Sequence, residues 1–221
     1  MTAQLSTAPS LRITEIFHSL QGETSTTGLP TVFVRLTGCP LRCHYCDTEY
    51  AFYGGERQTL EQILETVDGF GARHVTVTGG EPLAQPNCIP LLQQLCDNGY
   101  TVSLETSGAM AVDKVDPRVV KILDLKTPAS GEVERNLYDN IAHLQPHDEV
   151  KFVICDRRDY EWARLKMDEL NLQQRAREVL FSPSQGQLNP TELAQWILDD
   201  KLAVRFQMQL HKILWDDEPG H

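Results

Sequence analysis

The sequence predicts an α/β fold, a partial, open (β/α) barrel with about six core parallel strands. Short apolar stretches alternate along the 221 residues with amphipathic stretches of helical period, and strands that alternate with helices form parallel sheets. Six or seven strands are too few for a closed barrel of eight. Glycine-rich and polar motifs follow most of these strands, at the edge where parallel α/β sheets carry their active sites. The sequence therefore predicts an enzyme.

The strands are predicted from apolar runs and from the alternation of apolar and polar residues. Residues 11–17 alternate in this way and form a short strand or an extended lead-in. The chain after them, from Leu20 to Gly28, has the composition of a loop, for which a plain surface connection is one interpretation. The later strands are predicted over 31–36, 74–78, 101–105, 119–125, 149–154, 178–181 and 203–210.

Helices are predicted between the strands. Thr59 and Gln62 have the spacing of a capping box, so one helix begins there, and Gly69 closes it. Further helices are expected over 90–97, 131–144, 156–175 and 191–200.

The composition limits the classes of partner. The formal net charge of −11 disfavours a nucleic-acid backbone or an anionic membrane surface as the main partner, which leaves a small molecule or another protein. The length fits one domain over 1–221, with a catalytic core at about 11–210 and short N- and C-terminal extensions.

The compartment is predicted to be the cytoplasm. Residues 1–12 lack the basic and apolar regions of a signal peptide, and no apolar run approaches the length of a membrane-spanning helix. Six cysteines, three of them clustered, do not resemble a secreted disulfide framework.

The central motif is Cys39-Pro40-Leu41-Arg42-Cys43-His44-Tyr45-Cys46, directly after the strand over 31–36. Its C-x3-C-x2-C spacing lets three thiolates converge just past the end of that strand. Iron–sulfur clusters are held by cysteine thiolates, and a [4Fe–4S] cluster normally takes four. Three clustered ligands without an obvious fourth suggest a cluster with one iron open to another ligand.

A structural zinc site and unliganded core cysteines are the alternatives for this motif. A zinc site would take His44 or a distant histidine as its fourth ligand, but structural zinc modules usually combine two ligand pairs of similar spacing. The remaining cysteines, Cys88, Cys96 and Cys155, offer no second pair and are predicted to be core thiols.

Four other motifs stand at predicted strand ends. In Gly79-Gly80-Glu81-Pro82, the paired glycines carry no side chain that would block a ligand, and Glu81 offers its carboxylate to an ammonium group. A tight strand-to-helix turn also explains these glycines. The motifs are Gly79-Gly80-Glu81-Pro82, Glu105-Thr106-Ser107-Gly108, Asp124-Leu125-Lys126 and Ser182-Pro183-Ser184-Gln185.

Single residues add further hypotheses. Arg35 lies inside an apolar strand and needs a carboxylate, either from a substrate or from the protein. Asp47 and Thr48 supply oxygen atoms suited to Mg2+, or else cap a helix. Tyr45 offers its ring to a flat heterocycle, or packs in the ordinary way.

The cysteine motif, with Tyr45 before its last cysteine and with the later Gly-Gly-Glu-Pro, resembles the radical S-adenosylmethionine (SAM) enzymes. The resemblance implies a [4Fe–4S] cluster on Cys39, Cys43 and Cys46, whose open iron chelates the amine and carboxylate of SAM. One-electron reduction then cleaves SAM to methionine and a 5′-deoxyadenosyl radical, which abstracts a substrate hydrogen.

Further motifs make nearly the whole chain similar to the 7-carboxy-7-deazaguanine synthase family. The resemblance implies a lyase that converts 6-carboxy-5,6,7,8-tetrahydropterin to 7-carboxy-7-deazaguanine and ammonia, in queuosine and 7-deazapurine biosynthesis. It also implies a homodimer and a one-electron donor such as a flavodoxin or ferredoxin. The motifs are Leu20-Gln21-Gly22-Glu23, Val32-Phe33-Val34-Arg35-Leu36, Cys46-Asp47-Thr48, Lys126-Thr127-Pro128 and Gln209-Leu210-His211-Lys212.

The resemblance also implies individual roles. The pterin would contact Leu20, Gln21, Gly22 and Thr78, and its carboxylate Arg35. Mg2+ would bind Thr48. SAM would contact Tyr45, Cys46, Asp47, Gly80, Asp124, Leu125, Lys126, Ser182 and Gln185.

Two segments depart from the family pattern. Thr24-Ser25-Thr26-Thr27 stands where many members have a glycine-led loop, and the tail from Trp215 to His221 matches no pattern.

Two other functions are compatible with part of the sequence. An activase that installs a glycyl radical on a partner protein would need a polypeptide substrate, and the additional cysteine-rich motifs of many activases are missing from the sequence. A zinc-stabilised binding module without catalysis would leave Arg35 and the Gly-Gly-Glu-Pro motif unexplained.

Overall fold

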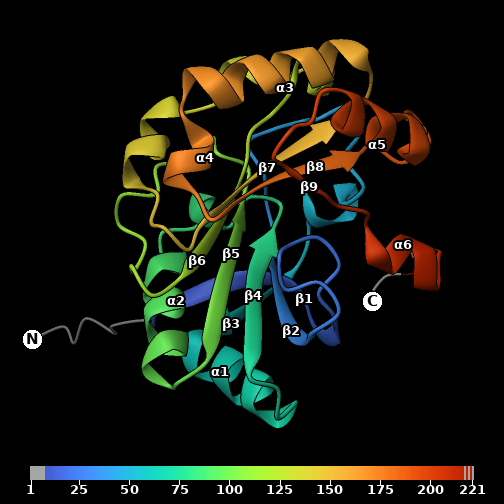
Figure 1. Cartoon of the computed structure of the whole chain (residues 1–221). Coiled ribbons are helices and arrows are strands. Elements are labelled where there is room, and N and C mark those ends of the chain that lie inside the picture. Colours follow the sequence, from blue (N-terminus) through green and yellow to red (C-terminus); the bar gives the residue numbers. More distant parts are fainter. Residues whose placement is uncertain (1–7, 217, 219, 221) are drawn as a thin grey trace, which may run out of the picture.

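The computed structural model describes residues 8–216, 218 and 220. In this part of the chain nine strands form one sheet in the order β3-β1-β2-β4-β5-β6-β7-β8-β9 (Figure 1). Every neighbouring pair from β2 to β9 is parallel, whereas β1 pairs antiparallel with both β2 and β3. The sheet does not close, because β3 and β9 stand at opposite edges. The predicted open barrel is thus confirmed.

The six core parallel strands lie where the sequence predicts them. They are β2 (Pro30–Leu36), β4 (His74–Gly79), β5 (Thr101–Thr106), β6 (Val120–Asp124), β7 (Glu149–Ile154) and β8 (Glu178–Pro183). The first strand, β1 (Ser10–Leu20), extends beyond its predicted end, because its residues pair with β2 as far as Leu20.

Two edge elements differ from the prediction. The sequence gives no sign of β3 (Glu56–Thr59), whose four polar residues become a strand only by pairing with the start of β1. The strand predicted over 203–210 is reduced to β9 (Arg205–Phe206), because only these two residues pair with β8. The chain then forms the short helix α6 (Leu210–Trp215).

Helices cover the sheet on the outside, with α1 (Leu60–Gly69) packed against β1 and β3 and α2 (Cys88–Asp97) against β5 (Figure 1). The capping box of α1 is confirmed, since Thr59 Oγ1 accepts from Gln62 N at 3.3 Å and Gln62 Oε1 accepts from Thr59 N at 2.9 Å. At the other end of the sheet lie α3 (Arg157–Glu169), α4 (Leu172–Arg175) and α5 (Pro190–Asp199). No helix in the described residues is long and apolar enough to cross a membrane.

The helix predicted over 131–144 is wrong. This stretch contains only short 3-10 turns, among them η5 (Tyr138–His143). Side-chain bonds to other loops take the place of helical bonds: Asn136 exchanges two hydrogen bonds with the backbone of Lys126, and Asn140 donates to the carbonyls of Gly108 and Met110. Propensity is overridden where such tertiary bonds are available.

The single helix predicted over 156–175 is also wrong, because it breaks between α3 and α4. Asn171 adopts a left-handed conformation with φ of 51°, which ends the regular helical path.

The loop between β1 and β2 enters the barrel and does not run over the surface. Because β1 is antiparallel to β2, this loop starts at the edge where the parallel strands begin. Residues 21–28, which we call the floor loop, are closed by bonds from Gln21 N to Leu29 O and from Gly28 N to Gln21 O. Gln21 and Thr24 are buried. The interpretation as a plain surface connection is therefore wrong.

Candidate active site

A cavity of about 300 Å³ opens where the parallel strands end, and every predicted motif contributes to its wall. Of the predicted site residues, Leu125 and Ser182 do not line it. Both are buried, so their contacts with SAM stay a prediction. The predicted residues that line the cavity are Leu20, Gln21, Gly22, Arg35, Cys39, Cys43, Tyr45, Cys46, Asp47, Thr48, Thr78, Gly80, Asp124, Lys126 and Gln185.

The cysteine loop leaves β2 through Gly38, whose φ of 99° suits glycine. Backbone bonds then fix the loop from two sides: Gly38 N donates to Ala51 O at 2.8 Å, and His44 N donates to Ser130 O at 3.0 Å. Cys39, Cys43 and Cys46 are free thiols of intermediate exposure, and all three face the cavity.

The three thiols are not arranged as ligands of a single zinc ion. Tetrahedral ligands at about 2.3 Å from zinc lie roughly 4 Å from one another. Among the described residues, the only three Cys, His, Asp or Glu side chains with ligand atoms within 4.8 Å of one another are Glu23, Asp47 and His211. His44 packs its ring against Gly131, where an added Cβ would lie 2.8 Å from Cε1.

Cluster assembly must remove protons from this loop. Burial raises the pKa of the Cys43 thiol to about 11, against the opposing effect of the Lys126 ammonium. Metal ligation requires the thiolate, so binding of iron here is coupled to proton release.

Glu81 does not offer its carboxylate to a ligand, which corrects the interpretation from the sequence. Its side chain is fully buried and accepts from Ser107 N at 2.7 Å, Ser107 Oγ at 2.5 Å, Thr106 Oγ1 at 3.0 Å and Leu83 N at 3.0 Å. Its backbone N–H donates to Gly38 O at 2.8 Å. Glu81 therefore ties the loop after β5 to the start of the cysteine loop.

Gly79 and Gly80 are glycines because the end of β2 and the cysteine loop pass directly against them. A Cβ on Gly80 would lie 2.2 Å from Gly38 O and 3.0 Å from Cys39 Cβ, and one on Gly79 would lie 2.6 Å from Leu36 O. The sequence predicts close approach at this turn, and the structure shows the cysteine loop making that approach.

Asp159 performs a similar task on the other side of the cysteine loop, and sequence reasoning missed it. This buried carboxylate at the start of α3 accepts from Thr127 Oγ1 at 3.0 Å, Ala129 N at 2.9 Å and Cys155 N at 3.1 Å. It thereby holds the turn that presents Ser130 O to the cysteine loop.

Two buried polar atoms beside the cysteines have no partner among the described residues. Asp124 pairs through Oδ2 with Lys126 Nζ at 3.0 Å, but its Oδ1 is unpaired, as is the hydroxyl of Tyr45. Burial alone would lower the pKa of Lys126, yet Asp124 and Tyr45 hold it well above its usual value. SAM carries ammonium, carboxylate and hydroxyl groups, so these unpaired atoms fit such a ligand.

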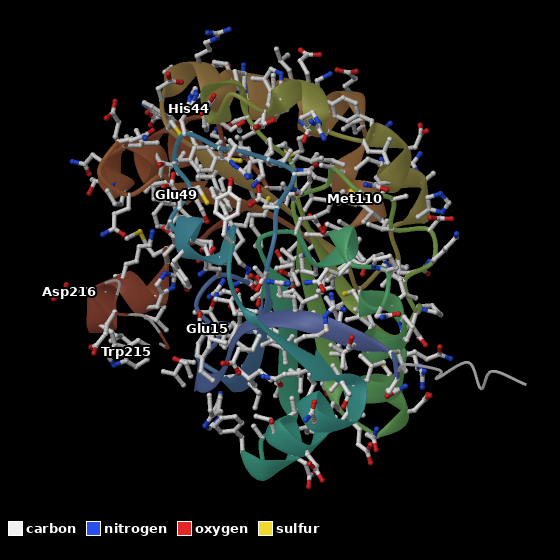
Figure 2. The ribbon with its side chains drawn as sticks, turned by 180° about the vertical axis from the view of Figure 1, so that it is seen from behind. Glu15, His44, Glu49, Met110, Trp215 and Asp216 are labelled. Carbon is white, nitrogen blue, oxygen red and sulfur yellow. The ribbon has the colours of Figure 1, made fainter. Side chains whose placement is uncertain are left out.

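Arg35 finds a carboxylate of the protein while part of its guanidinium still faces the cavity. Its Nε donates to Glu15 Oε1 at 2.7 Å, and Tyr50 OH donates to the same oxygen at 2.8 Å. Within the described part of the chain, no other carboxylate forms an ion pair with Arg35. Figure 2 shows Glu15 on the same side of the molecule as α6. Glu15 therefore orients Arg35 and leaves its remaining N–H groups to a ligand.

The floor of the cavity is a network of charged and polar side chains, in which Lys151 is buried and Glu23 and Glu105 are half-buried. Gln21 donates to Glu105 Oε1 at 3.2 Å, and Thr78 donates to Glu105 Oε2 at 3.1 Å. Burial raises the pKa of Glu105, and the nearby Glu23 adds to this. Burial opposes ionisation of Glu23 as well, but the ion pair with Lys151 brings the pKa of Glu23 below its usual value.

Sequence reasoning did not assign a site role to Glu23, Glu105 or Lys151. The available signal was the position of two of them: Glu105 and Lys151 are charged residues within core parallel strands, as Arg35 is. A buried charge of this kind needs a partner, but the sequence does not reveal which residue supplies it.

The C-terminal segment contacts the residues behind the cysteines. Asp47 Oδ2 accepts from Gln209 Nε2 at 3.0 Å and from Lys212 Nζ at 2.8 Å, and its Oδ1 accepts from Thr48 Oγ1 at 2.9 Å. Thr48 stands before the short turn η1 (Glu49–Ala51) without a side-chain capping bond, so the capping interpretation has no support. Trp215, the last residue of α6, and Asp216 after it lie on this side of the molecule (Figure 2). The tail from Trp215 to His221 lies partly outside the described residues.

Comparison with known proteins confirms the resemblance seen in the sequence. The family model of the radical SAM superfamily matches residues 33–124. The chain is 44% identical to the 7-carboxy-7-deazaguanine synthase of Koribacter versatilis, over 94% of this chain and 98% of that protein. It is 45% identical to the synthase of the same name from Chlorobaculum tepidum, over 97% and 98%.

A solved structure agrees with these relatives. The crystal structure of QueE from Escherichia coli covers 90% of this chain, and 94% of that chain is covered in return, with a TM-score of 0.72 and 26% sequence identity.

Proposed function

The chain belongs to the 7-carboxy-7-deazaguanine synthase family of the radical SAM superfamily, and we propose that it converts 6-carboxy-5,6,7,8-tetrahydropterin to 7-carboxy-7-deazaguanine with release of ammonia, in the route to queuosine and related 7-deazapurines. One observation carries the proposal. A single cavity joins the three cysteines at one side to a floor of arginine, lysine, glutamate and glutamine side chains at the other.

The residues of the cysteine side fit a [4Fe–4S] cluster and SAM. Cys39, Cys43 and Cys46 would hold the cluster, and the unpaired Asp124 Oδ1 would accept a hydrogen bond from SAM. When bound, cluster and SAM supply a 5′-deoxyadenosyl radical able to remove the hydrogen from C6 of the pterin. Lys126 is charged and buried, and it places its positive charge beside the Asp124 carboxylate.

The residues of the floor side fit the pterin. The N–H groups of Arg35 that Glu15 does not use would bind the 6-carboxylate. Gln21 and Glu105 present hydrogen-bonding groups to the edge of a flat polar ring, and Phe17 and Phe33, stacked at 5.0 Å, supply apolar wall. Leu20, Gly22 and Thr78 complete this side.

We propose that Thr48 would contribute its hydroxyl oxygen to Mg2+, which would supply positive charge for the substrate carboxylate. The hydroxyl lines the cavity and donates to Asp47 at 2.9 Å, so it keeps lone pairs for a cation. The same family membership supports a homodimer, a flavodoxin or ferredoxin as electron donor, and a cytoplasmic location. The sequence from 1 to 221 is proposed to act as one radical SAM domain.

The proposal is tested anaerobically. The protein is reconstituted with iron and sulfide, reduced, and supplied with SAM, Mg2+ and 6-carboxytetrahydropterin, and products are analysed by mass spectrometry. We expect both 7-carboxy-7-deazaguanine and 5′-deoxyadenosine, each lost in Cys43→Ala and retained in Cys96→Ala, whose thiol lies outside the cavity.

The other outcomes are distinct. Deoxyadenosine without the deazapurine would keep the radical chemistry and reject the substrate. A colourless, zinc-loaded and inactive protein would reject the enzyme altogether.

The magnesium site is tested separately with Thr48→Ala. We expect a higher Mg2+ concentration for half-maximal turnover, with iron content unchanged, whereas Thr66→Ala on the exposed face of α1 should behave as the wild type. An unchanged magnesium dependence in Thr48→Ala would count against the site.

A further inference from the structure

The floor loop has two sides that face different spaces. Gln21, Gly22 and Glu23 line the large cavity, whereas Thr24 and Ser25 line a separate small cavity of about 40 Å³ at the other end of the barrel. First residues of several strands, among them His74, Thr101 and Glu149, surround this second space. The loop therefore separates the site from the opposite edge of the sheet.

Ser25 is bound to Glu149 at this lower side. Its backbone N–H donates to Glu149 Oε2 at 3.1 Å, and its hydroxyl donates to Glu149 Oε1. Glu149 is 1% exposed, and among the described residues no other group hydrogen-bonds its carboxylate. A buried carboxylate is costly unless donors satisfy it, so each partner holds the other in place.

Strand β7 binds the floor loop at two positions along the strand. Residues 149, 151 and 153 point to the same face, since side chains alternate along a strand. Lys151 and Val153 line the large cavity, and Lys151 forms an ion pair with Glu23. Glu149, one step lower on the same face, binds Ser25. The basic Lys151 on the strand thus pairs with the acidic Glu23 on the loop, and the acidic Glu149 accepts from Ser25. The two strand residues are two positions apart, and so are the two loop residues.

A displacement of Ser25 would also move the loop residues that line the large cavity. Gln21 Oε1 accepts from Glu23 N at 2.9 Å, which makes the turn from 21 to 23 one unit. That unit carries both Gln21, which binds Glu105, and Glu23, which binds Lys151. Neither Ser25 nor Glu149 lines the large cavity, so they act on it through the residues of the floor loop.

We propose that the Ser25–Glu149 contact fixes the position of the floor loop inside the barrel. Through this contact, both residues position Gln21 and Glu23 for the pterin. This role rests on the proposed function, since it assigns the floor side of the cavity to the pterin.

The experiment compares Michaelis constants for the two substrates in Ser25→Ala, Glu149→Gln, the double variant and Ser25→Thr. Loss of the anchor should raise the KM for 6-carboxytetrahydropterin about tenfold, which corresponds to about 1.4 kcal/mol, and leave the KM for SAM and the iron content unchanged. The double variant should raise this KM by less than the product of the two single effects, because both substitutions act on the same contact. Ser25→Thr keeps both donors and should restore the wild-type KM.

Glu178→Gln is the matched control. Glu178 is the sheet partner of Glu149 at the start of β8, but it forms a surface pair with Arg205 at 3.0 Å. Hydrogen exchange of residues 21–28 gives a second readout that does not depend on activity, and it should quicken in Ser25→Ala and Glu149→Gln only.

Other results would overturn either the proposed anchor or the proposed function. A pterin KM that is unchanged, or that rises together with the KM for SAM, would overturn the anchor. Wild-type floor-loop exchange in both variants would do the same, even if a variant were too unstable for kinetics. A wild-type enzyme inactive on the pterin but able to cleave SAM would instead overturn the proposed function.

Discussion

The cysteine loop and the cations that line the floor of the cavity are held in place by different kinds of interaction. On the cysteine side, Glu81 and Asp159 are fully buried and bind only neutral N–H and O–H donors from neighbouring loops. On the floor side, Glu23 and Glu15 bind the cations Lys151 and Arg35, and the cations also line the cavity.

The difference follows from what each side has to do. A cluster needs its three thiols at fixed positions, and saturated carboxylates hold the cysteine loop without taking part in ligand binding. A charged substrate needs charges that it can share, and an ion pair facing a cavity supplies them. Changes on the cysteine side should therefore abolish cluster binding, whereas changes on the floor side should act on stability and on substrate affinity.

The largest effect is expected for Gly80→Ala. The new methyl group would lie 2.2 Å from Gly38 O, so the backbone that leads to Cys39 must shift, at a cost of about 3 kcal/mol or more. We expect loss of the visible absorbance and iron content after reconstitution, and no detectable turnover. Gly69→Ala is the control, because its Cβ would meet nothing within 4 Å. Normal iron content in Gly80→Ala would show that the contact is not needed.

Lys151→Met should destabilise the protein by roughly 3 kcal/mol at pH 7, because it leaves the half-buried Glu23 without its cation. The pKa of Glu23 is lowered in the folded protein, so the stability it contributes is present above its ordinary value of 4.5 and is lost as the pH falls below it. The effect of the substitution should therefore shrink below pH 4.5.

Urea unfolding at pH 7 and pH 4 measures both values. Lys166→Met removes an exposed pair with Glu169 and should change little. Equal destabilisation by Lys151→Met at the two pH values would contradict the assignment to the ion pair.

Glu81→Gln should cost about 2 kcal/mol, since an amide cannot accept from all the donors that surround this position. Thermal or urea unfolding of the cluster-free protein is the measurement, with Glu61→Gln on the exposed first turn of α1 as control. An unfolding free energy equal to that of the wild type would mean that the network is not what fixes this loop.

The smallest effect is expected for Glu15→Gln, which loosens Arg35 without removing it. The KM for the pterin should rise about tenfold, or about 1.4 kcal/mol, because Nε loses its charged partner. Inhibition by a tetrahydropterin without the 6-carboxylate should be unaffected, since that molecule has nothing for Arg35 to bind. If both molecules lost affinity equally, Glu15 would have a general structural role.

The parallel core and the cysteine side were largely predictable from the sequence. Their signals are local: apolar strands with a period, the capping box at Thr59, and motifs directly after a strand. Parallel strands bring their carboxyl ends to one edge, so motifs far apart in the chain converge without any further information. The prediction failed at 131–144 and 156–175, where the side chains of Asn136 and Asn140 and the left-handed Asn171 decide the backbone path.

The sequence by itself determined the α/β architecture, the cysteine motif and the family to which the chain belongs, because each of these depends on residue type and spacing along the chain. Only the tertiary structure decided that Glu81 is a buried tie, that Glu15 orients Arg35, and that the loop after β1 forms the floor of the cavity. These facts depend on partners far apart in the sequence, such as Lys151 and Glu23, which are 128 residues apart. A charged residue in a predicted core strand indicates that a partner is needed, but only the tertiary structure shows which residue is the partner.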